Sequence, residues 1–362
     1  MKKPLAALVV MGSLAGTAHA QSNVIIYGVM DTGYVKTTGY DAVMDENALS
    51  RLGFRGVEDL GSGRSVFFNL EERFRINSGT KTPSPGGPTD VDKMNAHRVY
   101  DGVANVGLAG DWGKLSLGRV FNVSTWYYQT LDPFRHDGVG RSLFSSQRQR
   151  SVSNTLRYDS PETGSLRGSA SFTRSGVRSG YDIPDGDSFK NDGYAAQVQY
   201  STPGIMLFGG FERVADSSNS IAWNVGAGYE YHTATITMGY IHTRDKAWSG
   251  GGYSYGHNGS QYIGTWGDRQ DQVIVGLVWK LGPGKLNASW NHGRYRAEGL
   301  DSESVNKLAL GYTYNLSRRF ALYADTAYAR FSEKFLAGAM TGRGPDSSRN
   351  YFMYQAGMTY RF

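Results

Sequence analysis

Four arginines alternate with apolar residues in one stretch of the chain, SRLGFRGVEDLGSGRSVFFNLEERFRI. They are Arg51, Arg55, Arg73 and Arg75. Arginine keeps its charge, and its planar fork binds a carboxylate or a phosphate through two hydrogen bonds. Period-two alternation is typical of a strand with two different faces, here one cationic and one apolar. The arginines can therefore bind anions from water or brace a wall by pairing with nearby acids, and the sequence leaves both open. Those acids are Asp59, Glu71, Glu72 and Asp101.

A second cationic run, FNVSTWYYQTLDPFRHDGVGRSLFSSQRQR, is the longest segment of the chain without strand alternation. Segments of this length that lack secondary structure are uncommon unless they are functional. We expect residues 121–149 to form a constriction that folds into a wide ring of strands and sets the size of a passage. Its aromatic start, Trp126, Tyr127 and Tyr128, can either anchor the segment to the wall or stack against sugar rings, and anchoring is the favoured interpretation.

The predicted anion-contacting set combines the strand arginines with those of this segment. It comprises Arg51, Arg73, Arg75, Arg98, Arg135, Arg141, Arg148, Arg150 and Arg157. The predicted opposing acids are Glu71, Asp132 and Asp137. Asp31 and Asp159 share faces with the strand arginines. Because rings of arginine favour anions, the set predicts a passage that prefers negatively charged solutes.

Catalytic motifs are missing from the sequence. It has no G-x-S-x-G, no H-E-x-x-H and no cysteine nucleophile. The run GDWGKL lacks the Ser or Thr that follows a P-loop lysine, and GSGRSV lacks the third glycine of a dinucleotide fingerprint. His232 and His242 are assigned to adjoining strands as structural residues. We therefore predict no enzyme, no cofactor and no metal site.

The elements that carry these residues are strands. From Val24 to the C-terminus the chain divides into segments of roughly ten to thirteen residues with period-two alternation. Candidate strands lie near 23–36, 48–58, 64–77, 96–109, 113–121, 150–159, 165–176, 191–201, 204–215, 220–231, 234–245, 269–281, 284–297, 303–315, 319–331 and 350–362. Tilted strands of about nine to eleven residues cross the hydrocarbon layer of a membrane.

The connections alternate between tight turns, such as EDLGSG and LGPG, and longer polar loops. That alternation is typical of an up-and-down antiparallel barrel with one end facing outward. Since lipid leaves no backbone group unpaired, the last strand, which ends on Phe362, is expected to pair with the first strand. The predicted fold is all-β: a sixteen-stranded antiparallel transmembrane β-barrel with an inward-folded constriction loop, spanning 21–362 as one domain.

The N-terminus and the composition limit where the protein works. MKKPLAALVVMGSLAGTAHA has a basic start, a short apolar run and an A-x-A site, so residues 1–20 are predicted to be a cleaved signal peptide. No later apolar run is long enough for a membrane helix. The chain has no cysteine, and its net charge of +6 is too small for a nucleic-acid binder of this length.

Several blocks of the sequence resemble the trimeric general porins of β-proteobacteria. They are VIIYGVMDTG, SRLGFRGVEDLGSG, VFFNLEERF, VGLAGDWGKLSLGR, SNTLRYDSPETG and AGMTYRF, and they run from the first strand to the last. The resemblance implies a homotrimer of sixteen-stranded outer-membrane barrels. Each barrel has a third long loop folded inward and basic wall residues that face acids. Members of the family are passive diffusion channels, several of them anion-preferring.

Residue by residue, the resemblance carries over in part. Arg51 matches a wall arginine at the family's constriction. The family's strand-four arginine aligns with Gly102, and Arg98 lies four residues earlier on the same strand face. The arginine that opens strand six appears as Arg150, one residue out of register. Phe362 matches the terminal residue through which such barrels are assembled.

We therefore expect an outer-membrane channel for passive diffusion of small hydrophilic, anionic solutes. The expected partners are outer-membrane lipid, lipopolysaccharide, two further copies of the chain and the barrel assembly machinery, with no nucleic acid. Two alternatives remain: a substrate-specific uptake channel with a saturable site for small carboxylates or sugars, and an enzyme or adhesin that uses the barrel as a scaffold.

Overall fold

The fold is known from a computed structural model of the chain. It describes residues 23–81, 99–143, 151–162, 164–174, 191–215, 220–244, 267–297, 299, 301–341 and 347–362. The predicted signal peptide, Arg98, Arg148 and Arg150 lie outside these residues.

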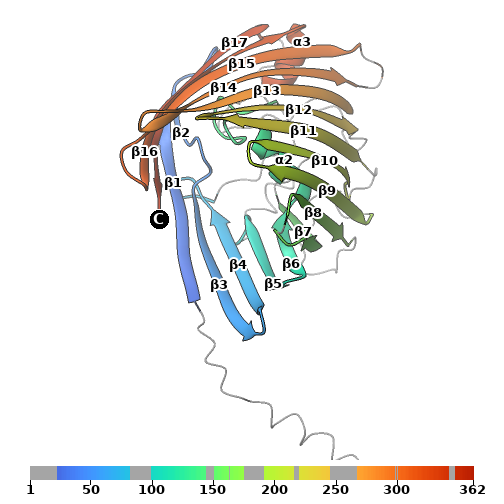
Figure 1. The fold of residues 1–362 in the computed structure, drawn as a ribbon. Coiled ribbons are helices and arrows are strands. Elements are labelled where there is room, and N and C mark those ends of the chain that lie inside the picture. The colour runs from blue at the N-terminus through green and yellow to red at the C-terminus, as the bar shows by residue number, and fades with distance from the viewer. Residues whose placement is uncertain are drawn as a thin grey trace, which may run out of the picture.

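The described residues form one antiparallel sheet that closes into a barrel (Figure 1). Its strands are β1 (Asn23–Thr37), β2 (Val43–Asp45), β3 (Arg51–Gly61), β4 (Arg64–Arg73), β5 (Val103–Gly110), β6 (Gly113–Phe121), β7 (Ser151–Asp159), β8 (Leu166–Thr173), β9 (Gly193–Thr202), β10 (Ile205–Arg213), β11 (Ile221–Tyr231), β12 (Ala234–Arg244), β13 (Arg269–Leu281), β14 (Gly284–Arg296), β15 (Glu303–Asn315), β16 (Phe320–Phe331) and β17 (Asn350–Arg361).

The sixteen-stranded barrel is confirmed, with details that differ at the ends of strands. β2 is a three-residue addition that pairs with β1 and was not expected. β5 begins at Val103, whereas the sequence pattern predicted a start near residue 96. His232 lies in the turn between β11 and β12 with a φ of 53°, so it is not a strand residue as expected.

The ring closes where the last strand meets the first, as the sequence predicted. Val29–Thr37 of β1 pair with Met353–Arg361 of β17. Phe362 continues this ladder, because its N–H donates to the Gly28 carbonyl at 3.2 Å and its own carbonyl accepts from the Gly28 N–H at 3.0 Å. No sheet edge is left along this seam, which is the condition for a barrel in lipid.

The two faces of each strand differ as period-two alternation requires. On β17, Tyr351, Met353 and Gln355 are buried inside the ring, whereas Phe352 and Tyr354 are exposed on the outside. An apolar outer face and a more polar inner face are the pattern of strands between lipid and a lumen.

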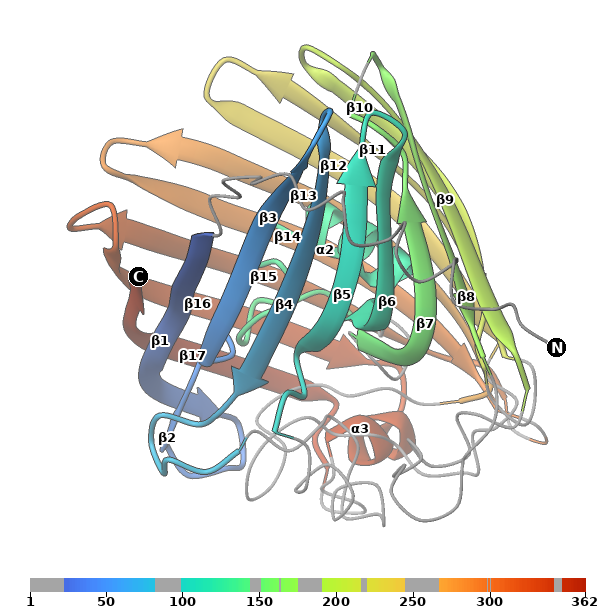
Figure 2. The ribbon, with the colours of Figure 1, turned by 90° about the horizontal axis from the view of Figure 1, so that it is seen from below.

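The two ends of the barrel also differ. Two-residue turns join β3 to β4, β9 to β10, β11 to β12 and β13 to β14 at one end. Helix α3 (Lys334–Thr341), in the connection between β16 and β17, lies at the other end, as Figure 2 shows. Helix α2 (Val123–Leu131) lies within the ring of strands in Figure 1.

Candidate constriction inside the barrel

The segment after β6 enters the ring as a helix. Asn122 begins α2 by accepting a hydrogen bond from the Ser124 N–H at 2.8 Å. An N-cap of this kind satisfies one of the free N–H groups of a first helical turn. The segment was expected to lack regular structure, so α2 is a correction; the residues from 144 to 149 lie outside the described ranges.

The aromatic start of the segment anchors it to the wall. Tyr127 and Tyr128 are buried, and the Tyr127 ring lies 5.2 Å from the ring of Phe208 on β10. The Asn122 side chain donates to Glu212 at 2.6 Å. This arrangement supports the anchoring interpretation for both tyrosines; the Trp126 side chain is outside the described part of the structure.

Glycines on the inner face of the wall make room for the next part of the segment. A Cβ added to Gly239 on β12 would lie 2.2 Å from Leu131, and one on Gly276 of β13 would lie 2.7 Å from Pro133. On β11 and β15, Gly226 and Gly311 make similarly close approaches to Leu131 and Phe134. Only a residue without a Cβ permits such contact. We call these four glycines the glycine track.

The glycine track was not predicted from the sequence. Its members are Gly226, Gly239, Gly276 and Gly311, one on each of four strands between β11 and β15. A signal was present, because each glycine occupies an inward position in the period-two pattern of its strand. Gly226 and Gly239 are directly paired across β11 and β12, whereas Gly276 and Gly311 are related to them through their close contacts with the inward segment, which the sequence pattern alone does not reveal.

Hydrogen bonds fix the far part of the segment across the lumen. The Val139 N–H donates to Gln355 on β17 at 3.0 Å, and the Gly138 N–H donates to the Asn47 carbonyl at 3.1 Å. Lys307 on β15 donates to the Arg141 carbonyl at 2.7 Å. The segment thus follows the inner wall from β9 and β10 to β17 and the connection before β3.

Asp132 holds the inward segment together through hydrogen bonds to its backbone. Its carboxylate accepts hydrogen bonds from the N–H groups of Phe134, His136 and Ser142, at 2.9, 3.0 and 2.7 Å. The side chain is fully buried, which differs from the expectation of an acid that faces the passage. Burial raises the pKa of Asp132, and the three N–H groups oppose that rise.

Helix α3 adds a second inward element that the sequence did not reveal. Leu336, Ala337 and Met340 are fully buried and share one apolar cluster with Val139 and Leu143 of the inward segment. The Leu336 N–H donates to Glu303 at 3.1 Å. Apolar side chains of α3 and of the inward segment therefore pack together against the inner face of β14–β17.

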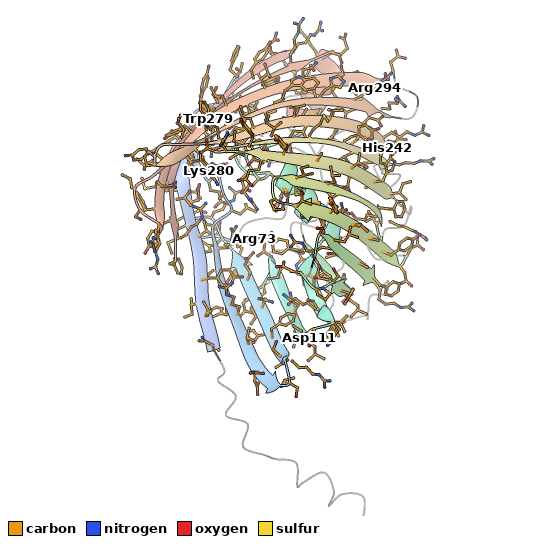
Figure 3. The ribbon with its side chains drawn as sticks, in the orientation of Figure 1. Arg73, Asp111, His242, Trp279, Lys280 and Arg294 are labelled. Carbon is orange, nitrogen blue, oxygen red and sulfur yellow. The ribbon has the colours of Figure 1, made fainter. Side chains whose placement is uncertain are left out.

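The predicted arginines on β3 and β4 lie on the opposite side, around one carboxylate. Glu71 lies 3.4 Å from Arg73 and 3.8 Å from Arg51, and it accepts from the Tyr27 hydroxyl at 3.2 Å. Arg51 and Arg73 are directly paired across the two strands. Figure 3 shows Arg73 inside the ring. The Arg73 N–H also donates to Asp101 at 2.8 Å.

Two further predicted arginines also have acidic partners. Arg75 lies 3.0 Å from Asp45, a residue of β2 that the sequence did not suggest. Arg157 lies 2.7 Å from Asp159 and donates to the Phe121 carbonyl at 2.8 Å, so it holds the start of the inward segment. Bracing is therefore part of what these arginines do.

The cations and acids of the wall differ in exposure. The Arg51 side chain is 30% exposed, whereas that of Glu71 is 6% exposed. On the inward segment Arg135 is exposed and Asp137 is half-buried. Lys285 of β14, which was not predicted, lies close enough to Arg135 to interact with it electrostatically. Solvent in the lumen therefore meets Arg51 and Arg135 more than it meets Glu71 or Asp132.

Comparison with known proteins assigns the family. Residues 5–334 match the family model described as Gram-negative porin. The chain belongs to the Gram-negative porin family.

Two curated relatives span most of this porin. An outer membrane porin protein of Bordetella pertussis is 29% identical, with 91% of this chain and 94% of the relative covered. Outer membrane porin protein 32 of Delftia acidovorans is 26% identical, with coverage of 91% and 90%. Our porin is accordingly an outer-membrane protein, and membership in this family points to a channel rather than to an enzyme.

Solved structures share the fold. The anion-selective porin from Comamonas acidovorans has a TM-score of 0.71 at 18% identity, covering 94% of this chain and 100% of that one. A trimer form of OmpT from Vibrio cholerae has a TM-score of 0.63 at 15% identity, with coverage of 94% and 99%.

Other kinds of site are absent from the described residues of the porin. Among these residues, no group of three or more His, Asp or Glu side chains is placed to hold a metal ion. No helix in the described ranges is long and apolar enough to cross a membrane. The lumen, with its packed side and its arginine side, is the functional feature that the described residues offer.

Proposed function

We propose that the porin is a passive diffusion channel that prefers anions, with residues 121–149 as its constriction loop. The observation that carries it is the difference in exposure inside the lumen. Arg135 is exposed and the Arg51 side chain is 30% exposed, whereas Glu71 and Asp132 are buried and Asp137 is half-buried. A buried carboxylate under an exposed guanidinium leaves a positive potential for a passing solute. The structural neighbour from Comamonas acidovorans is an anion-selective porin, which supports the same preference.

The test is the reversal potential of the channel in a planar bilayer between unequal KCl concentrations. The wild-type porin is expected to show a potential of anion-preferring sign. Replacing both Arg51 and Arg135 with Gln is expected to shift that potential toward cations. A cation-preferring wild type, or a potential that the double substitution leaves unchanged, would contradict the proposal.

A matched control removes the same charge outside the lumen. Arg318 and Arg319 are exposed in the connection between β15 and β16, at the tight-turn end. Their replacement with Gln is expected to leave the reversal potential unchanged, because exposed charges at a distance from the passage are screened by salt.

A saturable uptake site is the second candidate, but the described residues favour it less. A sugar-binding slide needs aromatic faces that are open to the lumen, and both Tyr127 and Tyr128 are buried. Block of the current by micromolar carboxylate or sugar would support the uptake channel over simple diffusion.

Assembly is part of the proposal. A homotrimer is supported by the family and by the trimer form of the Vibrio cholerae neighbour. Residues 1–20 are proposed as the cleaved signal peptide, and Phe362, at the closing seam, as the terminus that the barrel assembly machinery recognises. Outer-membrane lipid and lipopolysaccharide are the proposed surroundings. A monomer in mild detergent would contradict the trimer.

A further inference from the structure

A further arginine faces the lumen at the end of the last strand. Arg361 of β17 was not among the predicted anion-contacting residues. It shares a face of the strand with Gln355 and Thr359, which are buried inside the ring, whereas Tyr360 and Phe362 belong to the outer face. Unlike Gln355 and Thr359, Arg361 is exposed. Because neighbouring residues of a strand point to opposite faces, its exposed side chain lies toward the water of the lumen.

The backbone fixes Arg361 from both sides. Its N–H donates to the Arg319 carbonyl at 2.8 Å, next to β16. On the other side, Phe362 exchanges two hydrogen bonds with Gly28 of β1, at 3.0 and 3.2 Å, and Figure 1 marks the C-terminus beside β1. The charge of Arg361 therefore has a fixed place in the wall, even though it lies at the end of the last strand.

The closing seam places Arg361 in register with two arginines of the opposite side. Val29 of β1 pairs with Arg361 of β17 and with Arg51 of β3, and Arg51 pairs with Arg73 of β4. Strands lie about 4.8 Å apart, so the backbones of Arg361 and Arg51 are separated by roughly 10 Å. We call Arg361, Arg51 and Arg73 the seam row.

Arg361 also lies close to cations of the packed side. Lys285, an inward residue of β14, interacts electrostatically with both Arg361 and Arg135. Arg361 is therefore linked to Arg51 through the seam and to Arg135 through Lys285. Those two arginines are the cations on which the proposed anion preference depends.

The acids beside Arg361 do not face the water. β17 itself carries no acid, and the strands that flank it carry one each, Asp31 on β1 and Asp325 on β16. Both are buried, and the Asp31 carboxylate accepts hydrogen bonds from the hydroxyls of Tyr323, at 2.9 Å, and Thr359. Among the described residues, no acid lies within ion-pair distance of the Arg361 guanidinium. The positive charge of Arg361 therefore reaches the lumen without a partner that cancels it.

From this register we infer that Arg361 is a specificity-determining residue of the channel, which continues the cationic wall from Arg51 across the closing seam toward Arg135. An exposed guanidinium beside buried acids attracts a passing anion. The inference rests on the proposed anion preference. It adds that the last strand, besides closing the barrel, supplies part of the charge that selects the solute.

The experiment measures the reversal potential of single variants in a planar bilayer between unequal KCl concentrations and converts it to the permeability ratio of chloride to potassium. Arg361→Gln is expected to lower that ratio about twofold, the effect of one unit charge at roughly 10 Å in water. The matched control is Arg318→Gln, at an exposed arginine of the β15–β16 connection, which is expected to keep the wild-type ratio. A wild-type ratio for Arg361→Gln, or an equal fall in the control, would overturn the inference.

A second variant separates the charge of Arg361 from any role in folding. Arg361→Lys keeps the charge and is expected to keep the wild-type ratio. Acetylation of the purified, folded Arg361→Lys porin then removes that charge after folding is complete. The ratio is expected to fall further than in acetylated wild-type porin, whose arginine does not react. This comparison decides if Arg361→Gln does not fold, and equal effects of acetylation on the two proteins would overturn the inference.

The same measurements distinguish this inference from the proposed function. If wild-type porin prefers anions and the double substitution of Arg51 and Arg135 shifts its potential while Arg361→Gln does not, the inference alone fails. A wild-type porin that prefers cations would overturn both.

Discussion

The two sides of the lumen are built in opposite ways. Along β3, β4 and β7 the wall carries arginines whose partners are acids of the same wall, and Arg51 remains open to solvent. Along β11–β17 the wall is lined by the glycine track and packed by the inward segment and α3. Under the proposed function, the packed side sets the size of the passage, whereas its charge comes from Arg51 on the wall and Arg135 on the inward segment. Substitutions of buried residues on the packed side therefore test the size of the passage, and substitutions of these two arginines test its ion preference.

The largest expected effect is a loss of stability on the packed side, when a buried side chain of α3 is shortened. Leu336→Ala removes a fully buried side chain and is expected to lower the free energy of unfolding by about 2–5 kcal/mol. The control is Phe335→Ala, because the Phe335 side chain is 57% exposed and its loss leaves no cavity. Urea unfolding of the folded barrel, followed by gel mobility, measures both. Equal effects would mean that α3 does not pack inside the lumen.

Filling the glycine track is expected to displace the inward segment. Gly239→Leu places atoms where Leu131 now lies and should cost about 1–3 kcal/mol of stability, with a rise in single-channel conductance. Gly209→Leu is the matched control, since a Cβ there meets nothing closer than 3.6 Å. If conductance is the same in both variants, the segment does not limit the passage.

Asp132→Asn is expected to loosen the segment without filling space. An amide retains one acceptor oxygen for the three N–H groups, and each lost hydrogen bond contributes about 1 kcal/mol. The measurable result is noisier single-channel current with unchanged ion preference. Asp111→Asn, at an exposed carboxylate of the β5–β6 turn labelled in Figure 3, should leave the current trace unaltered.

The smallest effect is expected on the arginine side near the tight turns. Arg55 contacts the Tyr27 ring, with 5.5 Å between its guanidinium carbon and the ring centre, and it is exposed. Arg55→Gln should change neither conductance nor reversal potential measurably, whereas Arg51→Gln alone should shift the reversal potential toward cations. A larger shift for Arg55 than for Arg51 would place the narrow part of the passage closer to the tight turns.

The sequence predicted the strands because their pattern is local. Alternation along each segment gives the face of every residue, so Arg51 and Arg73 could be assigned to one face before any pairing was known. The helix α2 could have been found from its N-cap Asn122 and from Val123, Tyr127 and Leu131 at four-residue spacing.

The rest of the site depends on contacts between distant residues. Asp45 pairs with Arg75 only because β2 folds back on β1, and no local pattern indicates that β2 forms. Asp132 is an acid like any other in the sequence, and its burial follows from three N–H groups that converge on it. The glycine track depends on the register of five neighbouring strands and on the path of the inward segment, which together involve residues far apart in the sequence.

The seam between β1 and β17 has a kinetic consequence. Apart from the β1–β3 ladder, where the short β2 intervenes, every other long ladder in the described residues joins strands that follow one another along the chain, whereas this one joins Val29 to Arg361. Its formation has to wait for all the intervening hairpins, and closing so long a loop is entropically costly. The final step of barrel assembly is therefore expected to be slow and to depend on the last strand. Truncations that remove Phe362 should delay closure of barrels in which all other strands are paired.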